Sequence, residues 1–164
     1  MRVGGIVSVA ERLEELGIVL PEPPGAIAMY RPALQTGSWV LVSGQLALRE
    51  GAILHAGRLG EQVTVDEGRD AAHLATLNAL AAVLALRGDL EGLRVVRLVG
   101  YVASSPQFEA HPAVVNAASE LLRDVFGEEA GVGTRLALGV TSLPLQSPVE
   151  VELMLEVVAA AGEA

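Results

Sequence analysis

Three stretches of the chain repeat hydrophobic residues at the spacing of an α-helix. The longest follows Thr64, where Glu67 completes a capping box, and it stops near Gly88, a residue type that often terminates helices. The second covers residues 111–126, and a short one ends at Gly17. The sequence therefore predicts one short N-terminal helix and two long ones, the first of them rich in alanine and suited to close packing on a sheet.

Six segments have the alternating or continuously apolar pattern of β-strands. They cover residues 26–36, 38–42, 52–55, 95–103, 134–141 and 149–158. The last one alternates valine and leucine with Glu150, Glu152 and Glu156, which separates an apolar face from a face that carries carboxylates. Thr36-Gly37 predicts a hairpin turn, and the Pro-rich residues 143–148 join the last two strands. The order of these elements predicts an α+β fold, a mixed sheet with helices packed on one face.

The length of 164 residues predicts a single domain over residues 1–164, in which residues 1–24 supply the N-terminal helical extension and a linker. Hydrophobic residues make up 51% of the chain and aromatic residues 3%, so the core must consist mainly of Val, Leu, Ile and Ala. This amount of aliphatic surface on a small chain predicts that part of it is buried between subunits.

Charge and composition exclude several kinds of function. The net charge of −9 disfavours nucleic acid as a partner, because phosphate backbones are bound largely by Lys and Arg. All eleven basic residues are arginine, which excludes Schiff-base lysines, and the absence of cysteine excludes thiol nucleophiles. His55, His73 and His111 are scattered without ligand spacing, so we expect no metal and no other cofactor. With no signal peptide and no membrane segment in the pattern, we expect a cytoplasmic protein without a membrane partner.

Arg135 is the candidate ligand-binding residue that the pattern itself provides. It shares a strand face with Ala137 and Gly139, which leave room for a ligand beside the guanidinium. Arginine binds carboxylates in bidentate geometry, although from the pattern alone a surface ion pair explains the residue better. If the last two strands pair as a hairpin, Arg135 lies six residues beyond Thr141 (141 − 135 = 6), and therefore about 20 Å from Glu150. The two charges could then share a small ligand only across a subunit boundary.

Several weaker signals fall in a fixed order along the chain. Tyr30 and Ser43-Gly44-Gln45, taken alone, are typical of a partly buried tyrosine and of a turn. The full set is Tyr30, Ser43-Gly44-Gln45, Phe108, Asn116, Arg135, Leu143-Pro144 and Val149-Glu150-Val151-Glu152. This set resembles the signature of the RidA/YjgF family, the reactive-intermediate deaminases. The separations match too, from Tyr30 to Ser43 (43 − 30 = 13) and from Arg135 to Glu150 (150 − 135 = 15).

The resemblance implies a fold, an assembly and an activity. The fold would be chorismate-mutase-like, and a homotrimer with a central barrel of sheets would hold its sites in clefts between subunits. The activity would be hydrolytic deamination of 2-enamine and 2-imine acids to 2-keto acids and ammonia. In this interpretation Arg135 grips the substrate carboxylate and Glu150 positions or activates water. The further substrate-binding residues that the resemblance implies are Tyr30, Ser43, Gly44 and Asn116.

Other functions remain open at this point. Ala137 stands where the best-known branch of the family often has cysteine, and the segment between Asn116 and Arg135 is slightly longer, so the substrate range of this branch is open. The main alternative is a non-catalytic trimer that binds a small carboxylate-bearing metabolite, but the presence of both Arg135 and Glu150 favours catalysis. An endoribonuclease or translation inhibitor is a third possibility, which the acidic charge opposes.

Overall fold

A computed structural model of the chain describes residues 7–23 and 29–158, which form one sheet layer covered by helices. The helices are α1 (Val9–Glu15), α2 (Val65–Arg87) and α3 (His111–Gly131), with a 3-10 turn η1 (Pro144–Gln146). The strands are β1 (Ala33–Thr36), β2 (Trp39–Leu46), β3 (Leu48–Arg49), β4 (Ala52–Ile53), β5 (Leu93–Ala103), β6 (Thr134–Val140) and β7 (Val149–Val157). Five strands form a sheet in the order β1-β2-β7-β5-β6, and β3 pairs with β4 in a separate hairpin.

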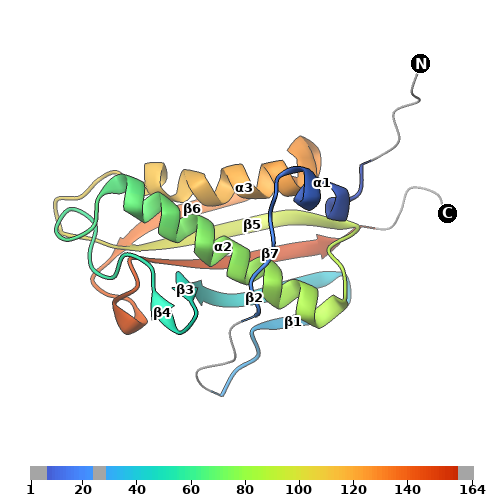
Figure 1. Cartoon of the computed structure of the whole chain (residues 1–164), viewed down its shortest axis with the longest axis horizontal. Helices are drawn as coiled ribbons and strands as arrows, with labels where there is room; N and C mark the ends of the chain where they lie inside the picture. Colours follow the sequence, from blue (N-terminus) through green and yellow to red (C-terminus); the bar gives the residue numbers. More distant parts are fainter. Residues whose placement is uncertain (1–6, 24–28, 159–164) are drawn as a thin grey trace.

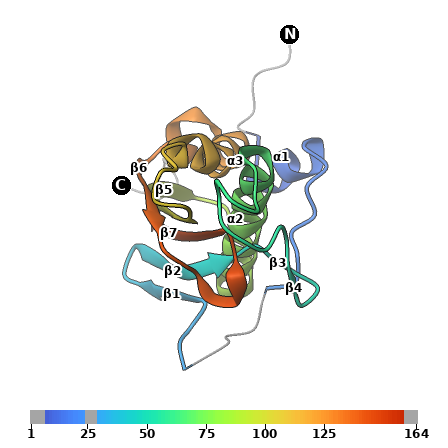
Figure 2. The ribbon, with the colours of Figure 1, turned by 90° about the vertical axis from the view of Figure 1, so that its left-hand side faces the viewer.

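The sheet is mixed and its helices lie on one side. Strands β5 and β6 are parallel, whereas the pairs β1–β2, β2–β7 and β7–β5 are antiparallel. Figure 1 shows α2 and α3 side by side across the sheet, and the view in Figure 2 shows both on the same side of it. The α+β architecture expected from the order of elements is confirmed.

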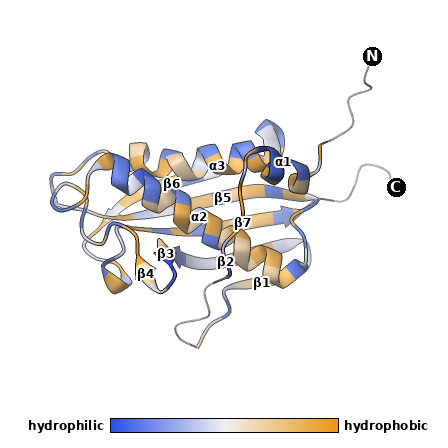
Figure 3. Ribbon diagram, viewed as in Figure 1, coloured by the Kyte–Doolittle hydropathy of each residue, from blue (hydrophilic) through white to orange (hydrophobic). Residues whose placement is uncertain are grey.

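The core lies between the helices and one face of the sheet. On β7, Val149, Val151, Leu153 and Leu155 are at most 1% exposed, as the alternation of that strand predicts. Strands β5 and β7 are coloured as largely hydrophobic where they run beneath the helices in Figure 3. Helix α3 packs directly on the backbone of β5, because a Cβ added to Gly100 would overlap the side chain of Val115. Small residues thus let aliphatic side chains fill a core that contains few rings.

The capping box predicted at Thr64 forms, and a second one is present in α1. In α2, the Thr64 amide donates to Glu67 Oε2 at 2.8 Å, and Thr64 Oγ1 accepts from the Glu67 amide at 3.3 Å. Helix α1 begins with the equivalent pair of Ser8 and Glu11. Helix α2 ends at Arg87 and is capped by Gly88, whose φ of 88° is available to glycine at little cost.

Several element boundaries differ from those expected. Of the strand expected over residues 26–36, residues 26–28 lie outside the described part, and β1 begins only at Ala33. Strand β2 continues to Leu46, and β4 stops at Ile53 before His55 takes a positive φ of 55°. Helix α3 runs to Gly131, beyond the end expected at residue 126. The backbone breaks at Gly127, so the residues after it do not continue the apolar stripe from which the helix was predicted.

The last two strands do not pair with each other. Strand β5 lies between β6 and β7, and among the described strands β6 pairs with β5 alone, in parallel. The reason is the crossover through α3, which brings the chain from β5 back to a parallel position at the sheet edge. The chain then passes the end of β5 through η1, where Leu145 and Gln146 have φ values of 56° and 60°. The hairpin on which the separation of about 20 Å was based is therefore wrong.

The face of the sheet away from the helices, called here the open face, carries both apolar and acidic side chains. Large apolar residues there are Leu34, Trp39, Leu41 and Leu136, with exposed fractions of 44%, 41%, 37% and 44%. The carboxylates of Glu150, Glu152 and Glu156 share this face because they alternate with the buried residues of β7. An exposed surface with this many large apolar residues is typical of a protein contact.

Candidate functional site

Arg135 lies on the edge strand β6 and points to the helix side of the sheet. Its ladder partner is Leu98, a core residue, and its NH1 donates to Asn116 Oδ1 at 2.6 Å and to Ser119 Oγ at 3.2 Å. Both partners belong to α3, so the helix orients the guanidinium. The residue is exposed, and it forms no ion pair with a carboxylate in residues 7–23 and 29–158. The surface ion pair that the pattern alone favoured is thus not seen there, and donors remain for a ligand carboxylate.

Ala137 and Gly139 lie on the same side of β6 as Arg135, as the period of two predicts. Neither residue carries side-chain atoms beyond Cβ, so little of the space above the strand beside the guanidinium is filled by β6 itself. Asn116, which was expected among the substrate-binding residues, is the closest hydrogen-bond partner of Arg135. Ser119 was not anticipated, because only the fold shows that it lies one helical turn from Asn116 on the same side of α3.

Glu150 lies on the open face near the start of β7. It is half-buried, and burial together with the nearby Glu152 raises the pKa of its carboxyl group. Its ladder partner is Tyr101, whose hydroxyl donates to Glu152 Oε2 at 3.1 Å. The two neighbouring carboxylates therefore differ. Glu152 accepts a hydrogen bond from Tyr101, whereas the surroundings of Glu150 disfavour its negative charge.

Ser43 and Gly44 approach Glu150 from β2. The ladder between β2 and β7 shifts between Val42 and Gln45, which places this Ser-Gly pair in a β-bulge. A Cβ on Gly44 would overlap the Glu150 carboxylate, so the glutamate packs against bare backbone. Ser43 Oγ donates to the carbonyl oxygen of Arg31 at 2.7 Å, which brings the segment after Tyr30 to the same place. Tyr30 itself is 43% exposed.

We expect Gly44→Ala to displace the Glu150 side chain, because the added Cβ would overlap its carboxylate. A crystal structure of the variant would measure the displacement. Gly37→Ala is a matched control, since it strains the same hairpin at a φ of 57° but places no atom near Glu150. Equal displacements of Glu150 in the two variants would show that the contact between Gly44 and Glu150 has no special role.

The structure thus brings the predicted site residues together in two groups rather than one. Arg135 and Asn116 lie on the helix side of the sheet, whereas Ser43, Gly44 and Glu150 meet on the open face. In the ladders of β5, Leu98 pairs with Arg135 and Tyr101 pairs with Glu150, an offset of three residues or about 10 Å along the strand. Within one chain, the sheet itself separates the guanidinium from the carboxylate.

Two buried polar residues that the sequence interpretation missed hold the strand ends around Glu150. Asn78 of α2 is fully buried and donates from Nδ2 to the carbonyl oxygens of Leu46 and Leu48, both at 2.9 Å. Ser147 is also fully buried; its Oγ donates to the carbonyl of Val149 and accepts from the Ala47 amide. A lone asparagine in the apolar stripe of α2 was the available signal for the first of these contacts.

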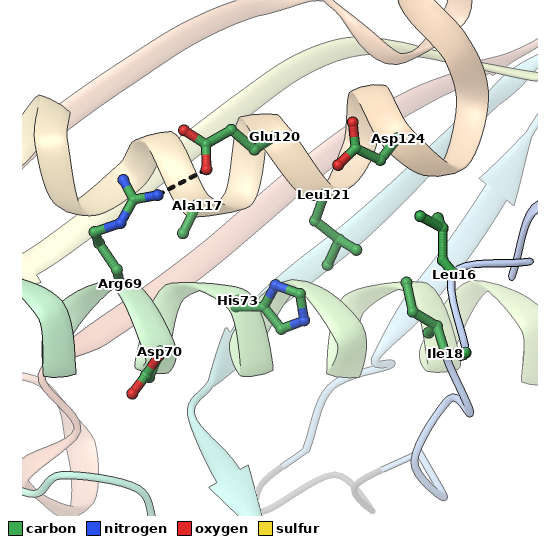
Figure 4. Close-up of a pocket in the computed structure, with 10 residues that line it drawn as sticks. Leu16, Ile18, Arg69, Asp70, His73, Ala117, Glu120, Leu121 and Asp124 are labelled. Atoms are coloured by element: carbon green, nitrogen blue, oxygen red, sulfur yellow. Dashed lines mark hydrogen bonds and ion pairs between the residues drawn. The ribbon is translucent and has the colours of Figure 1, made fainter.

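A separate cavity of about 620 Å³ lies between α2, α3 and the chain that follows α1. Figure 4 shows Arg69 and Glu120 facing each other across it, joined by a hydrogen bond of 2.7 Å, with His73 further along. Burial lowers the pKa of His73. None of the predicted site residues lines this cavity. It is therefore distinct from both groups above.

Among the described residues there is neither a membrane-spanning helix nor a metal-binding cluster. No helix among them is long and apolar enough to cross a bilayer. Their His, Asp and Glu side chains do not gather in threes at positions that could hold a metal ion.

Comparison with known proteins assigns the family. Residues 10–157 match the family model described as "YjgF/chorismate mutase-like, putative endoribonuclease". Protein TCP17 of Trypanosoma cruzi is 40% identical over 149 residues, which cover 90% of this chain and 93% of that protein. The crystal structure of Atu1372 from Agrobacterium tumefaciens is 40% identical, with a TM-score of 0.83 and coverage of 91% and 92%. A Shewanella oneidensis MR-1 structure with the same endoribonuclease description is 36% identical, with a TM-score of 0.86 and coverage of 91% and 99%. The chain therefore belongs to the RidA/YjgF family.

Proposed function

We propose that this protein is a trimeric hydrolase that converts reactive 2-imino and 2-enamino acids to 2-keto acids and ammonia. In this proposal Arg135 of one subunit and Glu150 of a neighbouring subunit act on the same substrate. The observation that carries it is the division of the site. An arginine with donors available for a carboxylate and a half-buried glutamate with a raised pKa lie on opposite faces of one sheet.

The reaction requires few catalytic groups from the protein. An imine carbon is already electrophilic, so water adds to it while Glu150 accepts one of the water protons. That proton passes to the imine nitrogen, which gives a carbinolamine. A second proton then moves from the carbinolamine hydroxyl to the amino group, the C–N bond breaks, ammonia leaves, and the oxygen stays as the carbonyl of a 2-keto acid; an enamine first tautomerises to the imine. Arg135 would hold the carboxylate and thereby fix the carbon that is attacked. The raised pKa of Glu150 suits a base that must both take and return a proton.

The open face supports assembly from copies of the chain. It exposes four large apolar residues on both sides of the acidic strand β7, two of them on β2 and one each on β1 and β6. A neighbouring subunit that covered this face would bury them, and would also bring a second chain to the strand end where Glu150 lies. The homotrimer and its central barrel of sheets are part of this proposal.

The endoribonuclease description that some relatives carry is the competing interpretation. The net charge of −9 and the row of Glu150, Glu152 and Glu156 on the open face both disfavour a phosphate backbone. Proteins that bind RNA mainly through phosphates are expected to carry the opposite charge.

Mixing two inactive variants would test the shared site. Light scattering should first show a trimer, and Arg135→Ala and Glu150→Gln are each expected to be inactive alone. If each site takes its arginine from one subunit and its glutamate from the next, random mixed trimers retain both residues in about a quarter of their sites. Activity should return to about that fraction after subunit exchange.

A monodisperse monomer in the light-scattering measurement would contradict the shared site, and so would the absence of recovery after exchange has been verified. Mixing either variant with itself is the control for recovery that arises from handling alone.

A further inference from the structure

Gly139 lies four residues beyond Arg135 on the same side of β6, and its backbone does not explain why it is glycine. Its φ is not in the positive range that favours this residue. Instead, a Cβ at Gly139 would overlap Nε2 of His111 and would lie 3.0 Å from Ser104 Oγ. The missing side chain makes room for an imidazole at the far end of the surface on which Arg135 lies.

His111 is held in that position from two sides. Ser104 Oγ lies 3.0 Å from His111 Nε2, and Phe108 packs edge-on against the ring at 5.1 Å between centroids. The hydroxyl of Ser104 is buried and has no other hydrogen-bond partner among the described residues, so its hydrogen is best placed on Nε2 of a neutral ring. The ring hydrogen then lies on Nδ1, and a protonated ring carries one there as well. In both states Nδ1 is a donor, and the described residues give it no acceptor.

The distance along β6 decides what this donor can reach. Four residues of strand separate Arg135 from Gly139, a span of about 13 Å. The carbon that reacts is bonded directly to the carboxylate at Arg135, so His111 is too distant to exchange protons with it. Arg135 NH1 is bound by Asn116 and Ser119, which follow His111 in α3 by five and eight residues, or about 7 to 12 Å along the helix. A ligand held by its carboxylate at Arg135 would therefore reach His111 only with the end of its side chain.

We propose that His111, oriented by Ser104, recognises an oxygen acceptor at the end of the substrate side chain. The preferred substrates would then be 2-imino acids whose side chain ends in a carboxylate or a carboxamide, in preference to those that end in a methyl group. The inference rests on the proposed function, because it takes the carboxylate position from Arg135. It adds a specificity-determining residue and a substrate class.

Binding of three 2-keto acids by isothermal titration would test the preference. The probes are 2-oxoadipate, its ω-amide, and 2-oxohexanoate, which has the same chain length without the terminal oxygen. The wild-type protein should bind both oxygen-terminated acids at least tenfold more tightly than 2-oxohexanoate. His111→Phe keeps an aromatic ring against Phe108. It should bring both affinity ratios, each oxygen-terminated acid relative to 2-oxohexanoate, close to one. Ser104→Ala should lower them part of the way, since Nε2 then loses the partner that orients the ring.

His73→Phe is the matched control, because it replaces the histidine of a different cavity and should leave both ratios unchanged. Ratios near one in the wild-type protein would overturn the inference, and so would ratios that survive unchanged in both His111→Phe and Ser104→Ala. Arg135→Ala separates this result from a failure of the proposed function. If it still binds 2-oxohexanoate normally, the carboxylate site itself is misplaced; if it loses that acid while the wild-type ratios are flat, only the role of His111 is wrong.

Discussion

Arg135→Ala is expected to weaken the binding of 2-keto acids to this protein by roughly 30- to 1000-fold. The guanidinium is oriented by Asn116 and Ser119 and has donors left for a carboxylate. Removing a charge-assisted fork of this kind costs on the order of 2 to 4 kcal/mol, which corresponds to that range of affinities. Isothermal titration with pyruvate or 2-oxobutanoate would measure the loss.

Arg123→Ala is a suitable control, since Arg123 is also exposed, lies on α3, and pairs with its neighbour Asp124. Arg135→Lys should retain part of the affinity, because a lysine keeps the charge but not the planar fork. Equal affinities in wild type and Arg135→Ala would mean that the carboxylate is bound elsewhere.

Glu150→Gln should abolish imine hydrolysis while leaving the binding of 2-keto acids within about threefold of wild type. The amide preserves the shape that packs against Gly44 but cannot accept a proton from water. A coupled assay, in which a dehydratase generates the imine and ammonia release is followed, would measure the rate. This variant also separates the two main alternatives, because a non-catalytic carboxylate binder would have no activity to lose, and unchanged hydrolysis in the variant would remove Glu150 from the mechanism.

The pH profile offers a second measurement of the same role. A base acts in its ionised form, so the rate falls as the pH falls through the pKa of Glu150. Burial and Glu152 raise that pKa, so the acidic limb should lie at higher pH than for an ordinary glutamate. Glu152→Gln removes the second contribution and should move the limb to lower pH. A limb that did not move would assign it to a different group.

Local signals predicted the helices and the faces of the strands well. The capping box at Thr64 is satisfied within four residues, and the alternation in β7 needs only the period of a strand to separate Val151 from Glu150. The common face of Arg135 and Ala137 follows from the same period. These features depend on neighbours in the chain, which the sequence states directly.

The pairing of strands depends on distant segments, and there the sequence interpretation failed. The separation of Arg135 from Glu150 was worked out on the condition that β6 and β7 pair as a hairpin, but the ladder of β5 with both strands excludes that pairing. The same limit hid Ser119, whose link to Arg135 spans 16 residues, and Ser147, whose contact with Ala47 spans 100. The order of the motifs along the chain predicted the site residues. The face of the sheet on which each of them lies could be learned only from the fold.

Trp39 lies on the open face opposite Glu156 and is the single tryptophan of the chain. Because no other indole contributes, the tryptophan fluorescence of the protein originates at one known position on the surface that the proposed assembly would cover. At 41% exposure, the ring of the isolated chain is in contact with water, and burial of that ring would move its emission to shorter wavelength. The unmodified protein thus carries an intrinsic optical probe of whatever occupies its open face.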